Sequence, residues 1–158
     1  MGVRPVECVP KPAPEVQQEL QKAFLEGRQV SLQVTGTSMV PFLRHRKDWV
    51  LLSPLEGVPR VGQILLFSQG ERLVLHRLRR KKQGYYIMNG DGQAQIEVIR
   101  PEQVQAVACA VIRRSGRTIR CDSLFFRLAG ALWYPTRPVR PQILWAAERA
   151  KAWKRKRS

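Results

Sequence analysis

Cysteine is scarce in this chain, and long apolar runs are missing. The three cysteines, Cys8, Cys109 and Cys121, form no C-x-x-C pair. An odd number without paired spacing favours neither a zinc site nor a disulfide framework, so we expect a reducing compartment. No window supplies the roughly 18 apolar residues of a membrane-spanning helix, and no signal-peptide core is present. These absences predict a cytoplasmic chain, attached at most peripherally to the inner membrane surface.

Acidic residues are also few. The 158 residues include 28 lysines and arginines against 12 aspartates and glutamates, which gives a formal net charge of +16 at pH 7. From Arg113 to the end of the chain, 13 basic residues stand against Asp122 and Glu148, so most of the excess lies there. A field of this sign attracts polyanions, either nucleic acid or acidic lipid, and indicates no particular fold. The length is typical of one domain.

The N-terminal part combines a proline-rich stretch with one helical pattern. Residues 1–14 hold four prolines, each of which removes a backbone donor and restricts the residue before it. We therefore expect an irregular lead-in. From residue 14 to residue 27, apolar side chains recur every four positions at Val16, Leu20 and Phe24. This spacing predicts one amphipathic helix.

Short strands broken by turn residues dominate the middle of the chain. Apolar and polar residues alternate from residue 30 to residue 34. Between Asp48 and Ile119 the strand-like runs are DWVLLS, QILLFS, RLVLHRL, YYIMN and QAVACAVIRR. No long helical period interrupts them. The pattern predicts a mainly β fold, built from short, twisted sheets.

Two helical patterns with a basic character follow the strands. Residues 124–133 form a short apolar stretch, and Arg140 lies on the basic side of a second helix. The apolar side of that helix consists of Val139, Ile143, Ala147, Ala150 and Trp153. The chain thus divides into three segments: a lead-in and helix (1–28), a β-rich domain (29–120) and a basic helical C-terminal extension (121–158).

The basic extension has two interpretations. A basic face opposite tryptophan and aliphatic side chains suits peripheral contact with an anionic membrane. A solvated charged face without a partner is the alternative. Nucleic acid is disfavoured as a partner, because about 15 helical residues ahead of the β-rich part cannot supply a helix-turn-helix.

A serine directly follows the first predicted strand. Gly36 stands two residues before Ser38, and Pro41 stands three residues after it. Such a turn projects the hydroxyl and leaves backbone N–H groups beside it, which is the arrangement of an oxyanion hole. A plain strand-to-loop turn can have the same sequence.

A serine hydroxyl needs a neighbouring base to become a good nucleophile. His45 and His76 are the two histidines of the chain. His76 lies in the strand RLVLHRL on the same face as apolar residues, where it is either a base or a histidine that only packs. His45 lies within a run of basic residues and is expected to be solvated. His76 is therefore the candidate base.

The order of these motifs resembles the box pattern of the signal peptidase I and LexA-like serine peptidase superfamily. The similarity covers about residues 30–115. It is strongest with the branch of archaeal, endoplasmic-reticulum and sporulation-type signal peptidases, which carry histidine where the main bacterial branch carries lysine. The motifs are Gly36-x-Ser38-Met39-x-Pro41, a strand from Asp48, Val61-Gly62-Gln63-Ile64, His76-Arg77 and Asn89-Gly90-Asp91-Gly92.

This resemblance implies a serine endopeptidase that cleaves a peptide, leader or propeptide substrate without a metal or organic cofactor. Ser38 would be the nucleophile, His76 the general base and Asp91 the carboxylate that supports the imidazole. The backbone N–H groups of Thr37 and Ser38 would form the oxyanion hole. Substrate contacts are expected at Gly36, Met39 and Pro41.

The chain departs from the family pattern at several points. Gln63 stands where the family usually has aspartate, and Lys47-Asp48 replaces a Gly-Asp pair. A second acidic residue beyond Asp91 is represented only by Glu97. Signal peptidases proper are held in the membrane by a spanning helix, so ordinary secretory cleavage is not expected. The alternative function is a non-catalytic β-domain that binds nucleic acid or an anionic membrane surface.

Overall fold

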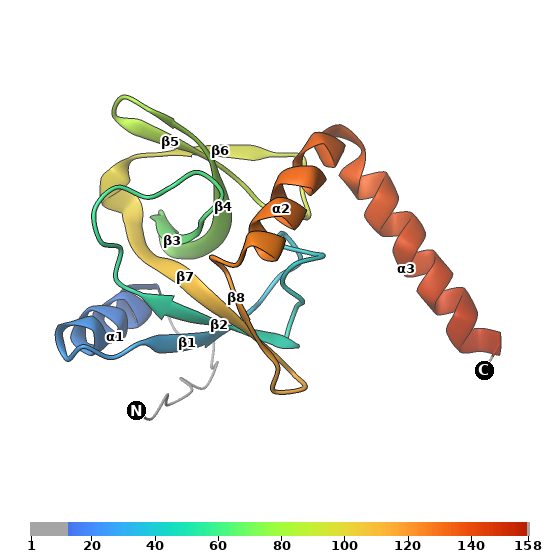
Figure 1. Ribbon diagram of the computed structural model, residues 1–158, viewed down its shortest axis with the longest axis horizontal. Helices are drawn as coiled ribbons and strands as arrows, with labels where there is room; N and C mark the ends of the chain where they lie inside the picture. Colours follow the sequence, from blue (N-terminus) through green and yellow to red (C-terminus); the bar gives the residue numbers. More distant parts are fainter. Residues whose placement is uncertain (1–12, 158) are drawn as a thin grey trace.

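A curled antiparallel sheet forms the body of the protein in the computed structural model, which describes residues 13–157 (Figure 1). The strands follow the order β1-β2-β7-β3-β4-β5-β6, and β8 pairs with β7. The predicted mainly β fold is confirmed. The strands are β1 (Val30–Gln33), β2 (Asp48–Ser53), β3 (Ile64–Gln69), β4 (Arg72–Lys82), β5 (Tyr85–Asn89), β6 (Ile96–Ile99), β7 (Val104–Arg113) and β8 (Thr118–Arg120).

Helices lie at the edges of this sheet. The α-helices are α1 (Ala13–Leu25), α2 (Leu124–Trp133) and α3 (Arg140–Arg157), and the 3-10 helices are η1 (Pro101–Gln103) and η2 (Tyr134–Val139). One N-terminal and two C-terminal helices were predicted, and all three are present. The proline-rich lead-in expected at residues 1–14 falls outside the described residues as far as residue 12. Within the described range, no helix is long and apolar enough to cross a membrane.

Two short strands were missed by the sequence analysis. β6 has four residues and β8 has three, too few for a period of two to be recognised. Among the strands that the structure describes, β6 pairs only with β5, and its residues Ile96 and Val98 are exposed. An edge strand with apolar residues on its solvent side does not show the usual alternation. The omission matters, because β6 carries Glu97.

The core consists of two clusters of apolar side chains. In the larger cluster, Leu20 of α1 and Phe126 of α2 pack with buried residues of β1, β2, β3 and β7. The smaller cluster packs residues of β3, β4 and β5, among them Phe67, Leu78 and Met88. Both helices that flank the sheet are therefore held by the same apolar interior as the strands.

β4 presents a histidine and an arginine on opposite faces. Successive side chains of a strand alternate between the two faces of a sheet, so His76 and Arg77 point in opposite directions. Both side chains are buried. The guanidinium of Arg77 lies between the rings of Phe42 and Phe126, and Gly130 of α2 packs directly against it. The Arg77 face is thus covered by α2.

α3 leaves the body of the protein instead of packing on it (Figure 1). The side predicted to be apolar is not buried, since Val139, Ile143 and Trp153 are all exposed. Arg140 was placed on the basic, solvated side, and this was wrong: its side chain is 0% exposed. The first turn of α3 is anchored by an arginine, and the rest of the helix projects away.

Candidate active site

Ser38 and His76 lie side by side although 38 residues separate them in the chain. The serine Oγ is 3.0 Å from Nε2 of the imidazole. Ser38 lies in the loop after β1, whereas His76 lies in the middle of β4, opposite Leu65 of β3. The imidazole is 4% exposed, and Phe67 packs edge-on against its ring. The two residues singled out by their motifs are therefore positioned as a nucleophile and a base.

Glu97 occupies the other side of the imidazole ring. Nδ1 of His76 is 2.9 Å from the Oε2 atom of Glu97, and the side chain of Glu97 is 11% exposed. The amide of Gln93 donates to the second carboxylate oxygen at 2.8 Å. A proton on Nδ1 that is donated to Glu97 leaves Nε2 free to accept the proton of Ser38. Such a carboxylate also stabilises the imidazolium when it forms.

Asp91 was predicted to be the carboxylate that supports the imidazole, but it contacts two arginines instead of His76. Its carboxylate is fully buried and accepts hydrogen bonds from Arg77 at 2.7 Å and from Arg79 at 2.7 Å. The reason is the alternation of β4. His76 faces Ser38 on one side, whereas Asp91 lies with the arginine that points to the other side.

The loop around Asp91 packs closely against the serine turn. The backbone N–H of Gly92 donates to the carbonyl of Ser38 at 2.6 Å, and that of Asp91 donates to Sδ of Met39 at 3.4 Å. A Cβ atom on Gly90 would lie 2.5 Å from the Ser38 carbonyl oxygen and 2.9 Å from Nε2 of His76. Only glycine allows this approach, because a Cβ atom would come closer than 3.0 Å to both atoms, which side chains essentially never do.

The serine turn also meets a requirement for oxyanion binding. Within residues 13–157, no hydrogen-bond acceptor is described for the backbone N–H groups of Thr37 and Ser38. Gly36 has a positive φ of 83°, which turns the chain after β1. Its N–H donates to Nδ1 of His45 at 2.8 Å. His45 therefore holds the turn in place.

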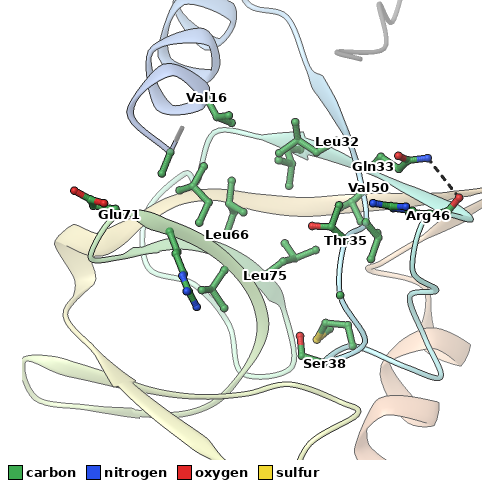
Figure 2. Close-up of a pocket in the computed structure, with 18 residues that line it drawn as sticks. Val16, Leu32, Gln33, Thr35, Ser38, Arg46, Val50, Leu66, Glu71 and Leu75 are labelled. Atoms are coloured by element: carbon green, nitrogen blue, oxygen red, sulfur yellow. Dashed lines mark hydrogen bonds between the residues drawn. The ribbon is translucent and has the colours of Figure 1, made fainter. Parts of the chain in front are cut away.

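A cleft of about 910 Å³ opens beside Ser38. Ser38 lies at one end of it, and Val16 of α1 lies at the other (Figure 2). Gly36 and Met39 are part of the lining, as expected for substrate contacts, but Pro41 is not. Its walls are otherwise mainly apolar, with Leu32, Val34, Val50, Leu52, Leu66, Leu73 and Leu75.

Unpaired strand edges border this cleft. Within residues 13–157, β1 is an edge strand of the sheet and pairs only with β2. Residues 72–76 of β4 pair with β3 on one side, whereas pairing with β5 begins only at Arg77. Such edges offer backbone donors and acceptors to an added extended chain.

A second buried carboxylate holds the loop that follows the serine turn. Asp48, the first residue of β2, is fully buried and accepts from the guanidiniums of Arg44 at 2.7 Å and Arg113 at 2.5 Å. Burial by itself raises the pKa of Asp48. The hydrogen bonds from Arg44 and the charge of Arg113 outweigh it and hold that pKa below its ordinary value. The Lys47-Asp48 dipeptide is therefore a structural anchor.

Metal ligands do not gather at this site. In the part of the chain that the structure describes, no three histidine, cysteine, aspartate or glutamate side chains are placed to hold a metal ion. Independently of this, the hydroxyl of Ser38, the imidazole of His76 and the carboxylate of Glu97 are groups suited to nucleophilic attack and proton transfer.

A known protein family matches most of the chain. The family model described as Peptidase S24-like matches residues 10–111. This range includes Ser38, His76 and Glu97 and ends within β7, so the C-terminal helices lie outside it. No curated protein sequence matches the chain.

Proposed function

The chain belongs to the Peptidase S24-like family, and on this premise we propose that it is a serine endopeptidase with a Ser38–His76 dyad supported by Glu97. The observation that carries the proposal is the 3.0 Å contact between the serine Oγ and the imidazole Nε2 at one end of a cleft. We propose that the protein resembles the histidine-type branch of the signal peptidase and LexA-like superfamily, and the imidazole beside Ser38 supports this proposal.

The proposed reaction proceeds through an acyl-enzyme. Oγ of Ser38 attacks the carbonyl carbon of the scissile peptide while Nε2 of His76 takes its proton, and Glu97 stabilises the imidazolium. The oxyanion of the tetrahedral intermediate accepts hydrogen bonds from the N–H groups of Thr37 and Ser38. The C–N bond then breaks and the imidazolium protonates the leaving amine. Water, deprotonated by His76, hydrolyses the ester and regenerates Ser38.

The proposed substrate is an extended peptide, such as a leader or propeptide, with apolar side chains near the scissile bond. The cleft is bordered by the outer edge of β1 and by the unpaired side of β4 at residues 72–76. Main-chain pairing with these edges supplies affinity, and the apolar lining selects side chains. Gly36 and Met39, close to Ser38 in the chain, are among the residues that line the cleft.

A fluorophosphonate probe tests the function without knowledge of the substrate. We expect the folded protein to be labelled, with the adduct mapped to Ser38 by mass spectrometry, and labelling to be lost in both Ser38→Ala and His76→Ala. Ser115→Ala, in an exposed turn, is the matched control and should label like the parent. Absence of labelling, or parent-like labelling of folded His76→Ala, would favour the rival function, a non-catalytic binding domain.

We further propose that the C-terminal helices contact an anionic membrane surface. On α2, four large apolar side chains are more than half exposed: Leu124, Phe125, Leu128 and Leu132. Trp145 of α3 is also exposed. Residues 137–157 contain eight lysines and arginines against Glu148 alone. Apolar side chains beside dense positive charge suit the headgroup region of acidic lipid, whereas a purely electrostatic partner would not need the apolar stripe.

Vesicle co-sedimentation tests this contact. We expect binding to phosphatidylglycerol vesicles, weaker binding to phosphatidylcholine vesicles, and a loss of binding in Leu128→Glu/Leu132→Glu. Leu25→Glu, at the exposed end of α1, is the matched control. Equal binding by parent and double variant would refute an apolar contact, and salt-sensitive DNA binding without vesicle binding would favour nucleic acid instead.

A further inference from the structure

The segment that follows the matched family range returns to the active site through one buried arginine. Arg140 is the first residue of α3, a helix that otherwise projects from the body. Its side chain is completely buried, although the neighbouring positions Val139 and Pro141 are exposed. Burial lowers the pKa of Arg140. Removing a cation from water is costly unless hydrogen bonds inside the protein replace those to water.

The guanidinium of Arg140 joins two parts of the protein. Its Nη1 atom donates to Oδ1 of Asn89 at 2.7 Å, to the carbonyl of Gly90 at 3.1 Å and to the carbonyl of Gln93 at 3.0 Å. Its Nη2 atom donates to the carbonyls of Trp133 and Tyr134, both at 3.3 Å. The guanidinium thus links the end of α2 to residues 89–95 by hydrogen bonds. We call residues 89–95 the glycine loop.

Two neighbours of Arg140 hold the same loop. Nε1 of Trp133 donates to the carbonyl of Asp91 at 2.7 Å, and Nη1 of Arg137 donates to the carbonyl of Ala94 at 3.3 Å. Together with Arg140, these side chains satisfy four backbone carbonyls within the glycine loop. Three positions of the C-terminal segment therefore fix its path.

The glycine loop in turn contacts every member of the proposed catalytic unit. Its Gly90 lies against the Ser38 carbonyl and Nε2 of His76, so closely that no side chain fits. Gly92 donates to the Ser38 carbonyl, and Gln93 donates to the Glu97 carboxylate. A shift of the loop would move the serine, the imidazole and the carboxylate relative to one another.

We propose that Arg140 is a positioning residue for catalysis, which makes the C-terminal segment part of the active site. The inference rests on the proposed peptidase function. Arg140 fixes the position of the glycine loop, and the position of the loop determines the distance between Ser38 and His76. Misplacement by about 1 Å can slow an enzyme about a hundredfold. A lysine at position 140 has a single ammonium and cannot span all five acceptors.

The experiment compares Arg140→Ala, Arg140→Lys and Trp133→Phe with the parent. The matched control is Arg149→Ala, which removes an arginine of α3 that stacks on Trp145. Two readouts are measured on folded protein: the rate constant for fluorophosphonate labelling of Ser38, and hydrogen exchange of amides in residues 36–40 and 89–97. Guanidinium ion at millimolar concentration is added to Arg140→Ala as chemical rescue.

We expect folded Arg140→Ala to label about ten- to a hundredfold more slowly, with faster exchange in both segments and partial rescue by guanidinium. Arg140→Lys should lie between the parent and Arg140→Ala, and Arg149→Ala should match the parent. Parent-like labelling and exchange in Arg140→Ala would overturn the proposal, as would lowered stability with an unchanged labelling rate of the folded fraction.

The proposal can still be tested if Arg140→Ala does not fold or if the parent protein is not labelled. If Arg140→Ala does not fold, Arg140→Lys and Trp133→Phe decide. Trp133→Phe keeps an aromatic side chain and removes the indole N–H that donates to the Asp91 carbonyl. Unchanged labelling and exchange in both variants would then count against the proposal. If the parent itself is not labelled, the peptidase function fails. Hydrogen exchange then still shows whether Arg140 holds the glycine loop, and unchanged exchange overturns that claim.

Discussion

Replacing Glu97 with glutamine separates the two candidate carboxylates of this site. The substitution keeps a carbonyl oxygen that can accept from Nδ1 of His76, so the ring keeps its orientation while the negative charge is removed. The ground state, with a neutral imidazole, is little affected. The transition state contains an imidazolium, and it loses the charge that stabilised it.

The size of the effect follows from the geometry. Unit charges about 4 Å apart at an effective dielectric constant near 20 attract each other by about 4 kcal/mol. Glu97 is 11% exposed, so little of this is screened by water. Since each 1.4 kcal/mol of barrier changes a rate by about tenfold, we expect Glu97→Gln to react about a hundred- to a thousandfold more slowly.

The assay is the rate of fluorophosphonate labelling of Ser38 near neutral pH, with Glu56→Gln as an exposed, charge-matched control. Asp91→Asn gives the opposite pattern. It leaves Arg77 and Arg79 without their carboxylate, and breaking a buried ion pair costs about 3–5 kcal/mol of unfolding free energy. Parent-like labelling of Glu97→Gln, with slow labelling of stable Asp91→Asn, would refute this reasoning and restore Asp91 as the supporting carboxylate.

Gly90, Asp48 and Cys121 each allow a further test. Gly90→Ala should lower both the unfolding free energy and the labelling rate, because its Cβ would lie 2.5 Å from the Ser38 carbonyl; urea unfolding and labelling check this. The pKa of Asp48 is held below its ordinary value of 3.8 by its arginine hydrogen bonds, so this stabilisation is complete above that pH and is lost as the pH falls through the lower folded-state pKa. Asp48→Asn should therefore be less stable than the parent near neutral pH, and the difference should shrink below about pH 3.8 in urea titrations. Burial raises the pKa of the Cys121 thiol to about 12, so iodoacetamide should modify this residue only after unfolding, as peptide mass mapping would show.

The contact between Ser38 and His76, the proposed nucleophile and base, was anticipated because each residue lies in a local motif and the order of the motifs resembles a known family. Ser38 is marked by the glycine and proline of its turn, and His76 by its place in an apolar strand. Strand alternation is a local property, so most of the sheet was predicted as well. The ten-residue helix-like run after Ser123 was equally visible, because nearly all of its residues are apolar.

The supporting carboxylate and the buried arginine could not be predicted in this way. Asp91 and Glu97 both follow the His76 strand, and only the path of the glycine loop determines which one meets the imidazole. β6 is also too short for its pattern to indicate that Glu97 faces inward. Arg140 begins a basic helix, where an arginine is normally solvated. Its burial depends on carbonyls of a loop about 50 residues earlier in the chain.

The alternation of β4 has a consequence for how reliably the protein can assemble. His76 and Arg77 are adjacent in the chain, so a slip of one residue between β3 and β4 would exchange their faces. A guanidinium would then meet Ser38, and the imidazole would meet Asp91. Such a misfolded sheet could keep its hydrogen bonds but would have neither the dyad nor the buried ion pair. The length of the turn around Gly70 thus fixes the register between β3 and β4. Adding or removing one residue in this turn would disrupt both the dyad and the buried ion pair.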